Sequence, residues 1–312
     1  MEKPGQHKPC MLFETMEWLS PQPGQTVVDL TVGLAGHARE ILSRIGPTGR
    51  YIGVEWDPET FEMARQALAD VPNATLFNVN FTELPQVLAE AGVEHVDGIL
   101  LDAGVNLYQL TAPDRSLSQN SEEGLDMRMV RSAGVPASEL VAQSSEDELR
   151  QILRLTLDER EVRQIARAII RRREREPIIT TRQLSQAILS TQSPEARRKG
   201  RQPAPALLAF RIAVNAELEN LAQGMRLSVE ALKPGSGRLV VLTFHSAEFR
   251  VCRQTMRTLA DPCECPRRLP CVCHRKPVIR ILTPKPLGPD EESLRLSGPQ
   301  CRSCRLHAAQ KL

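Results

Sequence analysis

Short apolar runs alternate with amphipathic stretches along the first hundred residues and again near residue 240. Five of these runs have the length and β-branched content of buried strands, namely Thr26–Thr31, Tyr51–Glu55, Ala74–Val79, Val96–Asp102 and Gly237–Phe244. Apolar residues recur at helical spacing between the first four runs, over Ala38–Ile45, Asp57–Ala69 and Glu83–Ala91. This alternation predicts an α/β fold with a mostly parallel, doubly wound sheet that is buried on both faces.

A purely helical pattern occupies roughly residues 136–230. Its segments are Ser138–Ala142, Glu146–Arg154, Glu159–Glu174, Arg182–Leu189 and Leu207–Leu232. Because another strand begins at Gly237, we expect the sheet to resume after these helices. The sequence therefore predicts an α/β domain in two parts, residues 1–107 and 211–312, with a helical domain inserted over residues 108–210.

The turn after the first strand carries the clearest chemical signal. Gly33 and Gly36 lie between that strand and the next helix, where free backbone N–H groups bind nucleotide-like ligands. Glu55 ends the following strand, at the position from which an acid reaches ribose hydroxyls. The chain has no Gly-x-Gly-x-x-Gly and no phosphate-binding Gly-x-x-x-x-Gly-Lys-Ser/Thr, which favours S-adenosylmethionine (AdoMet) over a dinucleotide. A purely structural turn between strand and helix is the alternative.

Composition narrows the class of protein. The 312 residues are 41% hydrophobic and 25% charged with a net charge of +2, which is ordinary for one large or two medium soluble domains. The aromatic content of 4% argues against a binder built from aromatic stacking platforms. No apolar run approaches the length of a membrane span, and residues 1–10 do not resemble a signal peptide. We expect a cytoplasmic protein with no membrane partner; a cleaved organellar presequence is the alternative.

The predicted helical insertion carries most of the positive charge. Residues 150–201 contain 14 Arg or Lys and 6 Asp or Glu, a net charge of +8. Arg160, Arg163, Arg167 and Arg171 recur at three- and four-residue spacing, so they lie on one face of a helix. Such a face is either simply solvated or binds a phosphate backbone, and the concentration of charge favours RNA contacts by Arg163, Arg167 and Arg171.

Six of the eight cysteines lie in the last fifty residues, whereas Cys10 and Cys252 stand alone. The six are Cys263, Cys265, Cys271, Cys273, Cys301 and Cys304. In a reducing compartment such a group indicates metal ligands or free thiols rather than disulfides. We formulate the hypothesis that these six cysteines bind a structural zinc ion that fastens the C-terminal tail to the sheet, with reduced thiols as the alternative.

Several segments together resemble one known family. They are His7–Glu14, Asp29–His37, Asp97–Val105, Gly124–Met129, Arg211–Leu218 and Phe244–Ser246. In order and spacing they are similar to the motifs of the MraW (RsmH) family of small-subunit ribosomal RNA cytosine-N4 methyltransferases, from His7 to about Leu287. The resemblance implies a Rossmann-like class I methyltransferase fold with a helical insertion, and an rRNA or an assembled small subunit as partner. The oligomeric state is left open, a dimer included.

The resemblance also implies a set of cofactor contacts. The residues concerned are Ala35, Gly36 and His37 at the turn, Glu55 at the ribose, Phe81 beside the adenine, and Asp102 and Gln109. Phe81 as a plain core residue and Gln109 as a plain loop residue are the alternatives.

This chain departs from the family pattern mainly where RNA would bind. The loop Asn106-Leu107-Tyr108 after Asp102 differs, as does the segment 204–208, whereas the cofactor motifs are mostly kept, with departures that include Ala35 and Glu55. Three hypotheses therefore stand: the family's methyl transfer to rRNA, a divergent paralogue with a different RNA or other substrate, and a non-catalytic RNA-binding or assembly factor.

Methylation of an exocyclic amine requires acceptors, because the nitrogen lone pair is delocalised into the ring. Orientation of the amine contributes most to the rate, and a group that takes its proton adds to this. Asp102 and Asn106 follow a strand's carboxyl end, and His245 follows another, so these three are the predicted catalytic residues. The target base has to be unpaired or flipped out to reach them. Asp102 as a cofactor ligand only is the alternative.

Overall fold

The computed structural model describes residues 9–111, 124–192, 203–266 and 272–312. These residues belong to two compact units, Met1–Gly104 with Leu218–Leu312, and Val105–Glu217. The helical insertion was expected over residues 108–210, so the second unit begins earlier and ends later than that range. Within the described residues, no helix is both long and apolar enough to cross a membrane.

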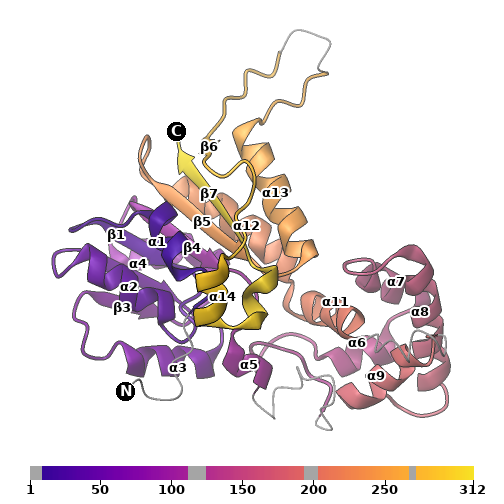
Figure 1. Ribbon diagram of the computed structural model, residues 1–312. Coiled ribbons are helices and arrows are strands. Elements are labelled where there is room, and N and C mark those ends of the chain that lie inside the picture. Colours follow the sequence, from indigo (N-terminus) through magenta and orange to yellow (C-terminus); the bar gives the residue numbers. More distant parts are fainter. Residues whose placement is uncertain (1–8, 112–123, 193–202, 267–271) are drawn as a thin grey trace. The chain divides into compact units, whose positions relative to one another are not determined.

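A seven-stranded sheet in the order β3-β2-β1-β4-β5-β7-β6 forms the centre of the first unit (Figure 1). Its strands are β1 Thr26–Asp29, β2 Arg50–Val54, β3 Ala74–Phe77, β4 Gly98–Asp102, β5 Arg238–Thr243, β6 Ile279–Ile281 and β7 Arg305–Lys311. The pairs among β1 to β5 are parallel, and β7 is antiparallel to both β5 and β6. The predicted mostly parallel, Rossmann-like α/β fold is confirmed.

Helices cover both faces of this sheet. They are α1 Leu12–Leu19, α2 Gly36–Ile45, α3 Pro58–Ala67, α4 Leu84–Ala91, α12 Glu217–Ala231, α13 Ser246–Ala260 and α14 Glu291–Ser297, with 3₁₀ turns η1 Phe81–Glu83 and η3 Pro299–Ser303. Successive strand residues alternate between the two cores, as the period of a strand requires. Val27 and Tyr51 pack with the residues of α1 and α2, whereas Val28 and Ile52 pack with those of α4 and α12.

Two strands were not predicted from the sequence. The residues of β7 include His307 and Gln310, so this segment lacks the continuous apolar run of a buried strand. It is nevertheless buried because β5 on one side and β6 on the other supply its hydrogen-bond partners. The segment is a strand through these long-range pairings rather than through its own composition.

The second unit is helical. Its helices are α5 Leu107–Thr111, α6 Ala137–Gln143, α7 Glu146–Leu153, α8 Glu159–Arg173, α9 Thr181–Leu189 and α11 Ala204–Asn215. Their apolar faces share one core that includes Leu149, Val162, Leu184 and Phe210. The amphipathic spacing noted in the sequence thus buries one side of α8 and leaves its arginines on the other.

One predicted helix is wrong. Instead of a single helix over Leu207–Leu232, α11 ends at Asn215 and α12 begins at Glu217, with Ala216 in the left-handed region at φ 48°. The Asn215 side chain donates to the Met127 carbonyl and accepts from the Met129 N–H, both at 2.8 Å. These tertiary hydrogen bonds hold the end of α11 where periodicity alone indicated a continuous helix.

Candidate functional site

The candidate site lies where the parallel strands of the first unit end. Asp29 closes β1, Glu55 follows β2 and Asp102 closes β4, and β1 pairs with both neighbours. Ligands of open α/β sheets bind at this edge, outside the carboxyl ends of the strands. Asn80 lies beyond the end of β3 and caps the 3₁₀ turn η1.

The turn after β1 is shaped by two left-handed residues. Gly33 has φ 54° and Ala35, the N-cap of α2, has φ 62°. An added Cβ at Gly36 would meet the Pro9 ring at 3.0 Å, so the chain crosses closely over this position. The backbone N–H groups at the start of α2 are the ones that the sequence assigned to a ligand. The structure thus brings Ala35, Gly36 and His37 together at one helix start.

Glu55 braces the same turn from the neighbouring strand. Its Oε2 accepts from the Gly33 N–H at 3.0 Å and its Oε1 from the Asp57 N–H at 2.9 Å. Burial outweighs these hydrogen bonds and raises the pKa of this carboxyl to about 7. Each oxygen keeps a second lone pair, so the residue remains able to accept from a hydroxyl group.

A second buried acid is Asp29, which the sequence singled out only as the first residue of the segment Asp29–His37. Its Oδ2 accepts from the Tyr51 hydroxyl at 3.0 Å and its Oδ1 from the Thr31 N–H at 3.1 Å. Burial raises its pKa to about 6 despite both hydrogen bonds. Tyr51 sits in a buried strand, where the sequence gave no sign of a polar role.

Asp102 is the carboxyl group with an acceptor to spare. Its Oδ1 is buried and has no hydrogen-bond partner among the residues that the structure describes. Burial, together with the charges of Asp29 and Glu248, raises its pKa well above the usual range. A buried unsatisfied acceptor costs free energy, so this oxygen is suited to a donor or a cation that arrives with a ligand.

His37 lies beside Asp102 in a fixed orientation. Its Nε2 is 3.2 Å from the Cys10 carbonyl, and its Nδ1 is 3.6 Å from Asp102 Oδ2. Burial lowers the pKa of this imidazole to about 4, so it is neutral near pH 7. Since a carbonyl only accepts, we assign the imidazole proton to Nε2, which leaves an acceptor lone pair on Nδ1 facing Asp102.

His245 begins helix α13 rather than standing alone. Its Nδ1 accepts from the Glu248 N–H at 3.3 Å, and its Nε2 lies 3.1 Å from Glu248 Oε1. Glu248 Oε2 in turn accepts from the Phe244 N–H at 2.7 Å. An added Cβ at Gly104 would be 3.3 Å from Glu248 Oε1, so this acid packs against the loop that follows Asp102. Sequence reasoning missed Glu248, although it stands at the third position of a capping box.

Phe81 packs against the sheet's helical cover. A Cβ at Gly224 of α12 would fall 2.6 Å from its ring, so the phenyl group lies directly on that glycine. The ring is only partly buried and borders the core that contains Leu101 and Met225. One face of the ring therefore lies in the core. Both interpretations from the sequence, a contact to the adenine and a plain core residue, remain open.

Asn106 and Gln109 cap each other at the start of α5, in the second unit. Asn106 Oδ1 accepts from the Gln109 N–H at 3.0 Å, and Gln109 Oε1 accepts from the Asn106 N–H at 2.9 Å. This reciprocal pair fixes the loop that the sequence assigned to substrate or cofactor contacts.

The six-cysteine zinc hypothesis needs correction. Cys301 forms a disulfide with Cys10, with their Cα atoms 5.6 Å apart, so it is not a thiol ligand. Cys304 is buried with its pKa raised by that burial, and it is not part of the described three-cysteine group. Only Cys263, Cys265 and Cys273 have their sulfur atoms within 4.8 Å of one another, and Cys271 lies outside the described residues. The expectation that disulfides are absent was likewise wrong at Cys10 and Cys301.

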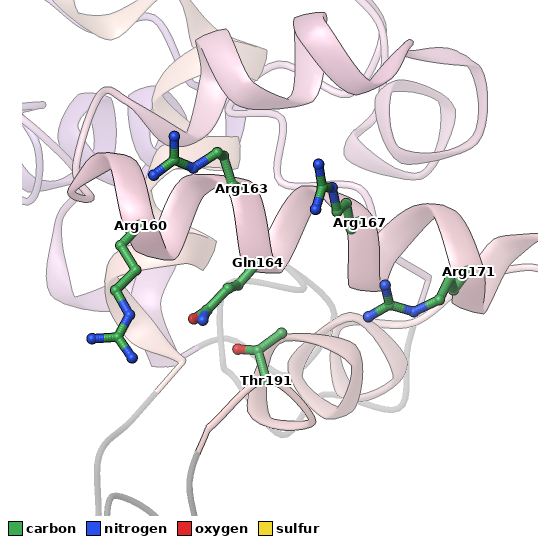
Figure 2. Close-up of a pocket in the computed structure, with 6 residues that line it drawn as sticks. All are labelled: Arg160, Arg163, Gln164, Arg167, Arg171 and Thr191. Atoms are coloured by element: carbon green, nitrogen blue, oxygen red, sulfur yellow. The ribbon is translucent and has the colours of Figure 1, made fainter.

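The predicted RNA-binding arginines line a pocket of about 480 Å³ in the second unit. Its lining consists of Arg160, Arg163, Gln164, Arg167, Arg171 and Thr191. Figure 2 shows the four arginines following one another along α8, with Gln164 pointing toward Thr191. Arg167 pairs with Glu146 at 3.4 Å, whereas the other three guanidinium groups form no salt bridge among the described residues, although Arg163 lies within electrostatic reach of Glu159. Arg172, on another side of the helix, is neutralised by Glu176 at 2.7 Å.

Comparison with known proteins agrees with the motifs. Residues 5–312 match the MraW methylase family. The chain is 42% identical over 315 residues to the ribosomal RNA small subunit methyltransferase H of Syntrophotalea carbinolica, covering 98% of both chains. The enzymes of the same name from Trichlorobacter lovleyi and Natranaerobius thermophilus are 40% and 38% identical, again over 98% of both chains.

Among solved structures, the chain is similar to a putative rRNA-methylase from Clostridium thermocellum, with 10% identity, coverage of 98% of each chain and a TM-score of 0.46. The family match covers almost the whole sequence, and relatives near 40% identity align from end to end. This chain belongs to the MraW methylase family.

Proposed function

We propose that this chain transfers the methyl group of AdoMet to the exocyclic N4 of a cytidine in small-subunit ribosomal RNA. Membership of a methylase family and relatives named for small-subunit rRNA methylation support the reaction class. The observation that carries the proposal is the buried Oδ1 of Asp102, at the end of β4 and beside His37; this oxygen has no hydrogen-bond partner in the described part of the chain.

The acidic character of the site supports a cationic cofactor. When bound, AdoMet supplies a methyl group on a positively charged sulfonium. Burial raises the pKa values of Asp29, Glu55 and Asp102, and the charge of Asp29 raises those of Glu55 and Asp102 further, so a nearby cation would stabilise the ionised forms. In this proposal the turn at Ala35, Gly36 and His37 binds the cofactor together with Glu55, Phe81, Asp102 and Gln109.

Asp102 is proposed to accept a hydrogen bond from the target amine and then to take the proton that the nitrogen releases. A carboxylate with a raised pKa is a stronger base than an ordinary one, provided that a cation keeps it ionised beforehand. The ring of His37, which the Cys10 carbonyl orients, has its Nδ1 lone pair 3.6 Å from Asp102 Oδ2, where it favours the protonated form of this carboxyl after proton uptake. Asn106 and His245 are proposed as further acceptors that align the amine.

The arginine row on α8 is proposed to bind the RNA backbone. Arg163, Arg167 and Arg171 are exposed together with Arg160, and an excess of unneutralised guanidinium groups on one side of a helix favours a phosphate-rich partner. An rRNA substrate also favours the cytoplasm as the place of action.

A structural zinc ion extends the proposal. Of the six cysteines first considered, it retains the three whose sulfur atoms lie close together, in the segment between α13 and β6. The ion has no part in methyl transfer, because none of these cysteines belongs to the acidic site.

Labelled AdoMet and small subunits from cells that lack the family enzyme test the proposal. After incubation with the purified chain, rRNA nucleosides are analysed by mass spectrometry. We expect new N4-methylcytidine with the wild type and with the control Asp70→Asn, whose carboxyl is exposed, and none with Asp102→Ala. Absence of transfer with AdoMet binding intact by calorimetry would instead favour a paralogue with another substrate. Loss of AdoMet binding in the wild type would favour a non-catalytic RNA-binding factor.

A further inference from the structure

The described residues of the segment between α13 and β6 have neither regular secondary structure nor a buried core. These residues, 261–266 and 272–278, contain no helix or strand and none of them is buried. In Figure 1 the two arms of the segment run away from α13 and back to β6 as extended chain. Val272 is 77% exposed, so it contributes no core. Long stretches without regular structure, such as these described residues, are usually either disordered or shaped by function.

Three cysteines nevertheless come together at this segment. The sulfur atoms of Cys263, Cys265 and Cys273 all lie within 4.8 Å of one another, and those of Cys263 and Cys273 are 3.8 Å apart. Zinc–thiolate bonds of about 2.3 Å in tetrahedral geometry place two sulfur atoms about 3.8 Å apart. A disulfide requires about 2.05 Å, so the observed separation matches two ligands of one ion and not a cross-link.

The surroundings of the sulfur atoms suit thiolates. The Val272 N–H donates to Cys265 Sγ at 3.4 Å, and backbone N–H groups that point at sulfur stabilise metal-bound thiolates. Arg275 pairs with Glu264 and lies within electrostatic reach of Cys265 and Cys273. Its positive charge offsets the excess negative charge that three thiolates bring to a divalent ion.

We infer that Cys263, Cys265 and Cys273 bind one zinc ion that folds the segment between α13 and β6. Thiolate ligands select zinc, copper(I) and iron–sulfur clusters among metals, and an isolated group of sulfur ligands without open catalytic chemistry is typical of structural zinc. A tetrahedral ion takes one more donor, and its identity is an outcome of the spectroscopy. The ion does not fasten the C-terminal tail, since Cys301 is already bonded to Cys10.

The ion would act on the sheet through the ends of this segment. The Val278 N–H donates to the Leu259 carbonyl at 3.0 Å, and the Leu312 N–H donates to the Val278 carbonyl at 3.0 Å. These hydrogen bonds join the end of α13, the start of β6 and the end of β7. An ordered segment therefore keeps β6 in register on β7, because it fixes where the chain returns to the sheet.

Metal analysis of the full-length chain, purified with reductant, tests the inference. We expect about one equivalent of zinc per chain, lost in Cys263→Ser, Cys265→Ser and Cys273→Ser and retained in the matched control Cys252→Ala, whose thiol is buried in α13. Cobalt(II) added to the zinc-free chain is expected to give sulfur-to-metal charge-transfer absorption and the visible bands of a tetrahedral ion.

Thiol alkylation followed by mass spectrometry tests the same inference on the wild type, so the result does not depend on whether a serine variant folds. In the wild type, zinc is expected to protect all three cysteines and a chelator to expose them. Less than about a tenth of an equivalent of zinc without a cobalt charge-transfer band would overturn the inference. A Cys263–Cys273 disulfide in the reduced protein would also overturn it.

The zinc inference rests on the proposed function only in that both assume a structural zinc ion; it does not depend on methyl transfer. Its failure can be distinguished from failure of the methyltransferase proposal by calorimetry with AdoMet. We expect chelation to leave AdoMet binding unchanged, because the acidic site contains none of the three cysteines. Loss of AdoMet binding on removal of zinc would contradict a purely structural role.

Discussion

The acidic site of the first unit and the arginine-lined pocket of the second differ in almost every physical respect. Asp29, Glu55 and Asp102 are buried or nearly so, and burial dominates their pKa values. The four arginines of α8 that line the pocket are exposed to solvent, where salt screens each charge. One region thus suits a small cation that replaces water, and the other suits a large polyanion that releases counterions.

The two regions also differ in how their side chains are held. Asp29 and Glu55 are fixed by hydrogen bonds from the backbone and, for Asp29, from Tyr51, whereas Asp102 Oδ1 has no hydrogen-bond partner among the described residues. By contrast, Arg160, Arg163 and Arg171 form no salt bridge within the part of the chain that the structure describes, although Arg167 reaches Glu146. A chemical step needs fixed geometry, whereas backbone binding tolerates mobile side chains. Changes in the first region should therefore have larger effects than single changes in the second.

Replacing Asp102 is expected to have the largest effect. Asp102→Asn keeps the shape of the side chain but removes the base, so the rate of methyl transfer should fall about 10²- to 10⁴-fold. Single-turnover assays with saturating RNA measure this rate, and RNA affinity should stay the same. A rate within about twofold of the wild type would show that Asp102 serves only as a cofactor ligand.

Loss of the Cys10–Cys301 disulfide is the next largest change. The bond joins residues 291 positions apart, and removing such a cross-link costs about 2–5 kcal/mol of unfolding free energy. Denaturant unfolding of Cys301→Ala compared with the control Cys304→Ala measures the effect. AdoMet affinity should also fall, because Pro9 and Cys10 lie against Gly36 and His37.

Reduction of the wild type provides the internal check. Added reductant should bring its stability down to that of Cys301→Ala and leave the variant unchanged. Equal stability of the wild type with and without reductant would mean that the cross-link does not contribute in solution.

The pH dependence of stability should report the buried acid Glu55. Its pKa is about 7 in the folded chain against 4.5 ordinarily, so the folded state binds more protons between these values. Stability from this group is present below about pH 4.5 and is lost as the pH rises through 7, by roughly 3 kcal/mol.

The variant Glu55→Gln isolates this effect, because the other titrating groups cancel in the comparison. The stability of the wild type relative to Glu55→Gln should decrease from pH 4.5 to pH 7 in the absence of AdoMet. A difference that is flat with pH would contradict a buried, protonated Glu55.

Single arginines of α8 should give the smallest effects. Each of Arg160→Gln, Arg163→Gln and Arg171→Gln should weaken RNA binding severalfold and reduce the salt slope of log K by about 0.7–0.9. Arg172→Gln is the matched control, since its guanidinium is already neutralised by Glu176. Fluorescence titrations at several salt concentrations measure the slope. Equal slopes for all four variants would place the RNA elsewhere.

The sequence was sufficient to predict those features that depend on a local pattern of residues. The five apolar runs became β1 to β5, and the glycine turn and Glu55, which the sequence placed on neighbouring strands, are joined by a hydrogen bond in the structure. The family motifs were confirmed by the match over residues 5–312. Each of these features depends on residues that lie close together along the chain.

Long-range contacts explain what the sequence did not reveal. Strand β7 depends on pairing with β5 and β6, and the break at Ala216 depends on hydrogen bonds from Asn215 to a distant loop. The Cys10–Cys301 bond joins the two ends of the chain, which no spacing rule anticipates. Glu248 lies beside Gly104 because β4 pairs with β5, which is a contact between segments far apart in the sequence.

Restoring rRNA methylation in living cells tests the central claim most directly. The chain would be expressed in cells that lack the family enzyme, and nucleosides of their small-subunit rRNA would be analysed by mass spectrometry. We predict that N4-methylcytidine returns at one position with the wild type and not with Asp102→Asn. Continued absence of the modified nucleoside, with the chain folded and AdoMet bound, would contradict the proposed function.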